Sequence, residues 1–415
     1  MSEAKRVVLE ASQVLTCWTE GEPRSQVAIP GAGVIERGAV AIFEGCVDAV
    51  GSQDEIRSRY PTAERIDLSN KILTPGIVDS HTHAVFGRWR LDEYELRCAG
   101  SSYAEIAAGG GGINASVLDL RERSEDELVE LTRPRLKSML QHGTTTAEVK
   151  SGYGLTLEDE LKMLRVIHRI AAEGWIDLIP TFLGAHAIPP EYRGHRSDYV
   201  DVLIGEMIPA VAESGLATFC DVFMEPGVFT PDEARRVLEA ALRYGLVPKL
   251  HADEFESSGG AELAVELGAA SADHLGAVSD AGIAALGNAT TVATLLPGTL
   301  MFLGRRNYAP ARRLIDAGAR VALATDFNPG SSPAVNMQVV MSLACSQMGM
   351  SPGEAFVGAT SNGAAALRLA AGRGTLAPGA PADIAAFDVP DFRLVPYLYG
   401  TNHCVGVWKR GNRVY

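Results

Sequence analysis

The feature that most constrains the fold of this chain is an alternation of short apolar segments with helix-like segments between about residues 76 and 330. We predict eight strands, at residues 76–83, 143–154, 177–187, 219–227, 246–254, 271–276, 291–298 and 320–330. Strands that alternate with helices form parallel sheets. Eight such units are the number that closes a (β/α)8 barrel, so we predict a TIM-like barrel of α/β class.

The segment 230–245 shows the helical pattern between the strands. Thr230 is a suitable N-cap, Pro231 fits the first helical position, and Gly245 predicts the end of the helix. A doubly wound sheet is the competing architecture, but such sheets usually carry a glycine-rich phosphate loop. The run "GGGG" at 109–112 does not match that motif, and we expect it to form a flexible loop over the barrel mouth.

Both ends of the chain have the pattern of short strands. Alternating apolar residues on either side of Glu44 and Gly45 predict a β-hairpin. We predict one small β-sandwich-like domain built from both termini, with residues 1–70 and 373–415, around a barrel of residues 71–372.

Composition excludes several classes of partner. The net charge of −14 argues against nucleic acid as a ligand. No apolar run is long enough for a membrane helix, and the polar N-terminus does not resemble a secretory signal. The six cysteines are widely spaced, which favours reduced thiols in a cytoplasm. We therefore expect a cytoplasmic protein that acts on a small molecule.

Histidines gather at the predicted strand ends, where barrels carry their functional residues. Five of the nine lie there, and the eighth strand ends near an aspartate: His81, His83, His186, His251, His274 and Asp326. The first and eighth strands of a closed barrel are neighbours, and the fifth lies across its mouth. We predict that four of these side chains bind one divalent ion: His81, His83, His251 and Asp326. Such a nitrogen-rich set suits zinc or iron, which lowers the pKa of water towards neutrality.

Motifs on nearly every predicted strand resemble the imidazolonepropionase family of the amidohydrolase superfamily. They are "GGGGI", "EVKSGYGL", "PTFLGAHAIP", "HADEF", "SADHLG" and "ALATDFNPGSSP". The resemblance implies a homodimeric hydrolase that cleaves the ring amide C–N bond of 4-imidazolone-5-propanoate to N-formimidoyl-L-glutamate in histidine degradation. The segment "DVFMEPG" has no lysine at the fourth strand end, which resembles the members that bind a single metal ion.

The resemblance also implies roles for individual residues. Arg90 would bind the propionate through a bidentate guanidinium, with Arg88 as its neighbouring rival. Glu254 would hold the ring nitrogen and move a proton. His274 would be an acid/base, an electrophile or an alternative ligand, and Asp326 would also accept the proton of water. The remaining implied substrate contacts are Tyr103, Tyr153, His186, Asn328, Gly330 and Ser331.

Four points stay open in the sequence. Lys150 is either a salt-bridging or a substrate-side residue, and Trp89 stands where the family more often has a small residue. The same barrel serves other cyclic amidases and nucleobase-type deaminases, which need no carboxylate clamp. A non-catalytic binding protein on this barrel is a further alternative, although the complete set of candidate residues argues against it.

Overall fold

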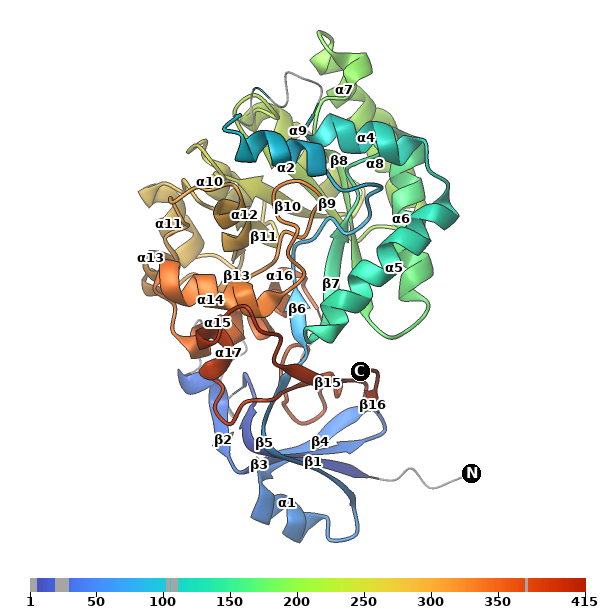
Figure 1. Ribbon diagram of the computed structural model, residues 1–415. Helices are drawn as coiled ribbons and strands as arrows, with labels where there is room; N and C mark the ends of the chain where they lie inside the picture. Colours follow the sequence, from blue (N-terminus) through green and yellow to red (C-terminus); the bar gives the residue numbers. More distant parts are fainter. Residues whose placement is uncertain (1–5, 19–29, 102–104, 106–110, 370–371) are drawn as a thin grey trace.

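The computed structural model describes residues 6–18, 30–101, 105, 111–369 and 372–415 (Figure 1). A large α/β region lies above a smaller β-sheet region, and both ends of the chain contribute to the smaller one (Figure 1). The strand that connects them, β5 (Glu64–Pro75), runs past residue 70 and leads through Gly76 into the first strand of the larger region.

The larger region contains the eight predicted strands, which are all confirmed. They are shorter than predicted: β6 (Ile77–Asp79), β7 (Thr144–Lys150), β8 (Asp177–Ala185), β9 (Phe219–Met224), β10 (Val247–Ala252), β11 (Ser271–His274), β12 (Val292–Leu295) and β13 (Val321–Leu323). They pair in chain order, and every pairing is parallel.

The barrel closes just beyond the ends of its first and last strands. Thr82 forms a parallel bridge with Phe327. The His83 amide donates to the Phe327 carbonyl at 2.8 Å, and the Asp326 amide donates to the His81 carbonyl at 3.1 Å. This closure brings the two histidines after β6 against the aspartate after β13.

Helices surround the strands of the larger region (Figure 1). Those before β10 are α2 (Leu91–Cys98), α4 (Ile113–Arg121), α5 (Glu125–Gln141), α6 (Leu157–Ala171), α7 (Arg196–Val202), α8 (Ile208–Ser214) and α9 (Pro231–Arg243). Those after it are α10 (Gly260–Glu266), α11 (Asp280–Gly287), α12 (Pro297–Phe302), α13 (Ala311–Asp316), α14 (Met337–Met348), α15 (Pro352–Gly358) and α16 (Ser361–Ala366).

The predicted helix at 230–245 is confirmed as α9. Thr230 caps its first turn by accepting from the Glu233 amide, and the Glu233 carboxylate accepts from the Thr230 amide. This reciprocal pair is a capping box.

Among the described helices, none combines the length and the apolar character needed to cross a membrane.

The strands of the two chain ends form one sheet. Its members besides β5 are β1 (Val7–Leu15), β2 (Val34–Glu36), β3 (Gly38–Phe43), β4 (Cys46–Ser52), β14 (Ile384–Phe387), β15 (Cys404–Lys409) and β16 (Asn412–Arg413). The order is β16-β15-β14-β5-β1-β3-β4, with β2 beside β1, so the C-terminal strands add to the edge that β5 offers. The predicted hairpin is confirmed as β3 and β4, and Glu44 and Gly45 turn with φ of 49° and 79°. The short helix α1 (Gln53–Arg59) packs on β3 and β4, whereas α17 (Leu394–Tyr397) packs against α14 of the larger region.

Candidate active site

Four predicted metal ligands meet at the carboxyl ends of the barrel strands. The His81 Nε2 atom lies 3.2 Å from His83 Nε2, and these atoms lie 3.6 and 3.5 Å from Asp326 Oδ1. His251, on β10, places a ring nitrogen within 4.8 Å of donor atoms of His81 and His83. All four side chains are buried, so the structure brings together the set that the sequence predicts.

The protonation of these histidines suits a metal ion. Burial, followed by the charge of Lys150, holds the pKa of His81 well below its usual range. Burial, followed by the charge of His186, does the same for His83. Two neutral imidazole nitrogens 3.2 Å apart need a shared proton or a cation between their lone pairs. Three imidazoles and one carboxylate are ligands that zinc and ferrous iron accept, so the residues fit a divalent ion.

Carboxylates orient two of these imidazoles from behind. Asp273 Oδ2 lies 2.7 Å from His81 Nδ1, and Asp221 Oδ2 lies 3.0 Å from His251 Nδ1. A partner at Nδ1 leaves Nε2 of each ring as the remaining donor and raises the basicity of the ligand. The two aspartates are fully buried and were not predicted from the sequence.

Beneath the ligands lies a network of buried charges. Lys150 Nζ lies 2.7 Å from Asp221 Oδ2 and 2.9 Å from Glu148 Oε2, and Lys249 Nζ lies 2.9 Å from the same Glu148 oxygen. Burial opposes the charged form of Lys150, yet the carboxylates of Asp221 and Glu148 raise its pKa above the usual value. Burial likewise opposes the Asp221 carboxylate, but the charges of His251 and Lys150 hold its pKa well below the usual range. Lys150 is therefore a salt-bridging residue.

A small cavity of about 50 Å³ lies over the histidines. Its described lining comprises His83, Arg90, Ile113, Tyr153, His186, Phe223, His251, Glu254, Phe255, His274, Leu303, Asp326, Asn328 and Ser331. Six of the predicted substrate contacts are in this lining. Gly330 is not, although it packs against one of them, and Tyr103 lies outside the described residues.

Arg90 brings a positive charge into this cavity. Its side chain is only 8% exposed, and Nε and Nη1 have no hydrogen-bond partner among the described residues. Its nearest carboxylate oxygen, from Glu93, is 3.7 Å away. A Cβ on Gly330 would lie 1.3 Å from Arg90 Nη2, so a glycine is required there for the guanidinium to fit. Buried N–H groups without partners carry a free-energy cost that a bound carboxylate would remove.

Comparison with known proteins identifies the family. The sequence pattern of the amidohydrolase family matches residues 72–415. An imidazolonepropionase of Geobacillus kaustophilus is 48% identical and covers 98% of this chain and 97% of its own length. One of Solibacter usitatus is 45% identical over 98% of both chains. The chain belongs to the imidazolonepropionase family.

Solved structures of other amidohydrolases share the fold. An Escherichia coli guanine deaminase has a TM-score of 0.73 at 16% identity and covers 99% of both chains. An adenosine deaminase from Xanthomonas campestris, solved with bound zinc, has a TM-score of 0.69 at 18% identity. It covers 98% of this chain and 92% of its own. These likenesses show that the chain shares the amidohydrolase barrel fold.

Two titratable groups in this imidazolonepropionase-family site have shifted pKa values. Burial, followed by the charges of Asp326 and Glu225, raises the pKa of Glu254 well above its usual value. Its Oε1 lies 3.5 Å from His274 Nδ1, and burial holds the pKa of His274 well below its usual range. A carboxyl group whose pKa is raised keeps its proton to higher pH, which favours a role as general acid.

His274 remains an alternative ligand. Its ring, His81 and Asp326 also place donor atoms within 4.8 Å of one another. His274 and Asp326 have φ of 81° and 54°, backbone conformations that residues other than glycine rarely adopt. Such backbone strain is typical of functional positions.

Hydrogen bonds of the Asn328 side chain stabilise the turn after β13. Asn328 Oδ1 accepts from the amides of Gly330 and Ser331 at 2.8 and 2.7 Å. Its Nδ2 donates to the carbonyl of Asp326 at 2.7 Å. Asn328 therefore shapes the turn that carries Ser331 into the cavity and places Gly330 beneath Arg90.

Trp89 does not belong to the described lining of the inner cavity. Its ring packs on Phe86 and Phe327, with centroids 4.8 and 5.9 Å away. Arg88 points away from the site, with its side chain 69% exposed. Of the two arginines in this loop, only Arg90 lines the cavity.

Proposed function

We propose that the protein hydrolyses the ring amide of 4-imidazolone-5-propanoate to N-formimidoyl-L-glutamate, a step of histidine degradation. The observation that carries this proposal is the buried Arg90 guanidinium, whose free N–H groups share one small cavity with the histidine–aspartate cluster. A substrate with a carboxylate tail and a hydrolysable ring suits both groups: the tail pairs with the Arg90 guanidinium, and the ring lies at the histidine–aspartate cluster. The full-length relatives named imidazolonepropionase support the same assignment.

The metal would be held by His81, His83, His251 and Asp326, and we infer zinc or iron from this ligand set. When bound, the ion supplies Lewis acidity that makes water a nucleophile at neutral pH. Thr299 donates to Asp326 Oδ2 at 2.6 Å. This bond occupies one carboxylate oxygen and leaves Oδ1 on the side of the histidines.

The side chains of the chain itself account for binding and proton transfer. Arg90 binds the propionate, and Tyr153 and His186 lie beside the ring in the same cavity. Attack of water forms a C–O bond at the ring carbonyl and breaks the C–N bond. Asp326 accepts a proton from water, His274 polarises the carbonyl oxygen, and Glu254 supplies the proton that the leaving nitrogen gains.

The test compares two arginines that lie two residues apart in the same loop. Arg90→Ala should raise KM for 4-imidazolone-5-propanoate by about 10- to 100-fold, because hydrogen bonds to charged groups contribute about 1.5–3 kcal/mol. Arg88→Ala removes the same charge from an exposed position and should leave KM within a factor of two. Equal KM values for the two variants would refute the assignment of the propionate. A deaminase, which needs no carboxylate clamp, would not turn over this substrate in either variant.

We further infer a cytoplasmic homodimer. The support is the family resemblance and the six cysteines, all of which are free thiols. Sedimentation velocity should give about twice the chain mass, and a single species at the chain mass of 44.0 kDa would contradict the dimer.

A further inference from the structure

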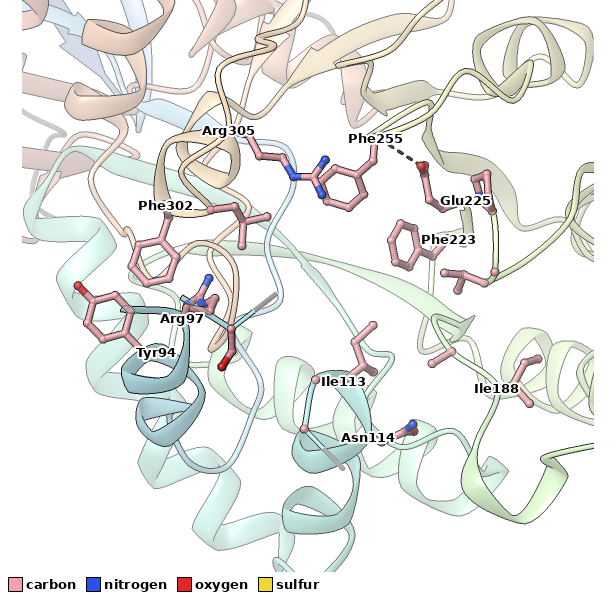
Figure 2. Close-up of a pocket in the computed structure, with 18 of the residues that line it drawn as sticks. Tyr94, Arg97, Ile113, Asn114, Ile188, Phe223, Glu225, Phe255, Phe302 and Arg305 are labelled. Carbon is pink, nitrogen blue, oxygen red and sulfur yellow. Dashed lines mark hydrogen bonds between the residues drawn. The ribbon is translucent and has the colours of Figure 1, made fainter. Parts of the chain in front are cut away.

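A second, larger chamber lies outside the inner cavity. Its volume is about 1210 Å³, and four apolar residues line both spaces: Ile113, Phe223, Phe255 and Leu303. These side chains form a neck between the two, and Figure 2 shows three of them labelled around the chamber. A ligand that reaches the histidines through this chamber must pass them.

The charges of the chamber wall are unbalanced. Its described lining contains the guanidiniums of Arg97, Arg196 and Arg305 and the carboxylate of Glu225. Arg196 is neutralised by Glu233, 2.7 Å away. Neither Arg97 nor Arg305 forms an ion pair with any described residue. After α2 in the sequence, the one charged residue before Gly111 is Glu105, which is exposed and is not in the described lining of the chamber.

The only described carboxylate of this lining is already satisfied. Glu225 accepts from the backbone amides of Glu254, Phe255 and Glu256 at 3.2, 3.2 and 2.8 Å. Figure 2 marks the bond to Phe255 as a dashed line. Two unpaired cations therefore dominate the chamber, although the whole chain has a net charge of −14.

Aromatic rings hold both guanidiniums in place. The Arg305 guanidinium lies 4.2 Å from the centre of the Phe255 ring, and that of Arg97 lies 4.7 Å from the Phe302 ring. Stacking on a ring uses the face of a guanidinium and leaves N–H groups at its edge for a ligand. One N–H of Arg97 donates to the Gly330 carbonyl at 3.0 Å. Arg97 therefore lies beside the loop that packs against Arg90. Burial, followed by the charge of Arg90, lowers the pKa of Arg97.

We propose that Arg97 and Arg305 form an outer carboxylate-binding site, which attracts the anionic substrate into the chamber before its tail passes the neck and reaches Arg90. The site takes small aliphatic carboxylates as a class. Its assignment to the substrate rests on the function proposed above. Fixed charges that line a concave surface raise the local concentration of an oppositely charged ligand and its rate of association, and salt weakens both effects.

Adjacent arginines in the chain provide a matched pair for the test. Arg305 lines the chamber and Arg306, also exposed, does not. Arg305→Gln should lower kcat/KM for 4-imidazolone-5-propanoate about two- to fivefold at low ionic strength and flatten its dependence on salt. The kcat value should not change, and Arg306→Gln should behave as the unaltered protein. Equal salt dependence in the two variants would overturn the proposal, and so would a salt-independent loss of kcat in Arg305→Gln.

A binding measurement separates this proposal from the proposed reaction. Glutarate, an unreactive dicarboxylate, can be titrated calorimetrically into Arg90→Ala protein, in which the inner clamp is absent. Adding Arg305→Gln should weaken glutarate binding at least twofold, whereas adding Arg306→Gln should not. This result would support the outer site even if 4-imidazolone-5-propanoate were not turned over. Equal glutarate affinity in both double variants, or no binding in Arg90→Ala protein, would refute it.

Discussion

Replacing Arg135 with methionine should damage both stability and substrate binding. Arg135 lies on α5 and is 9% exposed. Its Nη1 donates to the carbonyls of Ala84 and Phe86 at 3.2 and 2.6 Å, and its Nη2 donates to that of Gly87 at 2.7 Å. These carbonyls belong to the loop between His83 and Arg90, so one buried guanidinium fixes the chain between a proposed metal ligand and the proposed carboxylate clamp.

The magnitude follows from what the substitution leaves behind. Arg135→Met leaves three carbonyls of a buried loop without a hydrogen-bond donor, and each unsatisfied group costs about 1–3 kcal/mol. Methionine also relieves the cost of burying a guanidinium that has no carboxylate partner among the described residues, and it keeps part of the contact with the Phe86 ring. We therefore expect a net loss of about 2–4 kcal/mol in the free energy of unfolding. The loosened loop should raise KM about tenfold, with a smaller change in kcat.

Urea unfolding and steady-state kinetics measure the two effects, and the same helix supplies a control. Arg133 pairs with Glu130 and Glu173 on the surface, so Arg133→Met should cost under about 1 kcal/mol and leave KM unchanged. Arg135→Lys keeps the charge, and its KM should lie between those of Arg135→Met and the unaltered protein, because one ammonium can donate to some of the carbonyls. The reasoning would be refuted if Arg135→Met and Arg133→Met had the same stability and the same KM.

Carboxylates in three other places offer separate tests. Asp221→Asn should weaken metal binding about 10- to 100-fold in a chelator competition, because it loosens the hold on His251 Nδ1; unchanged affinity would contradict the orienting role. Glu254→Gln should lower kcat about 10²- to 10⁴-fold without loss of bound metal, and an unaltered kcat would exclude it as the proton donor. The hydrogen bond from Arg196 lowers the pKa of Glu233 to about 2. The Glu233 carboxylate should therefore stabilise the fold by about 1–2 kcal/mol above its usual pKa of 4.5, and this contribution should be lost as the pH falls towards 2. Thermal unfolding of Glu233→Gln should therefore differ from that of the unaltered protein at pH 7, and the difference should shrink as the pH falls from 4.5 towards 2. A gap independent of pH would contradict the pairing.

The barrel and the convergence of the candidate ligands at its mouth were predictable because they depend on local patterns. Each strand is a short apolar run, and parallel strands bring their carboxyl ends to one edge, so His81, His251 and Asp326 could be placed together without coordinates. The length of the last strand was not predictable. β13 ends at Leu323, and Asp326 reaches the site through the turn and the Thr82–Phe327 bridge that closes the barrel.

The buried charges were not predictable, because a lysine or glutamate is normally a surface residue. Glu148, Lys150 and Lys249 lie on strands, and their burial depends on which strands face one another across the barrel. A retrospective signal exists in the spacing: Lys249 lies two residues before His251, and alternation along a strand directs both to the same face. Arg135 gave no such signal, because nothing in its helix distinguishes it from the half-buried Arg133.

Metal removal and reconstitution test the central claim most directly. Protein freed of metal by a chelator should not convert 4-imidazolone-5-propanoate, whose loss is followed by its ultraviolet absorbance. About one equivalent of zinc or ferrous ion per chain should restore turnover in the range of about 1–1,000 per second, and should restore nothing in His251→Ala protein. Undiminished turnover by the metal-free protein, or full recovery of the His251→Ala variant, would contradict the account.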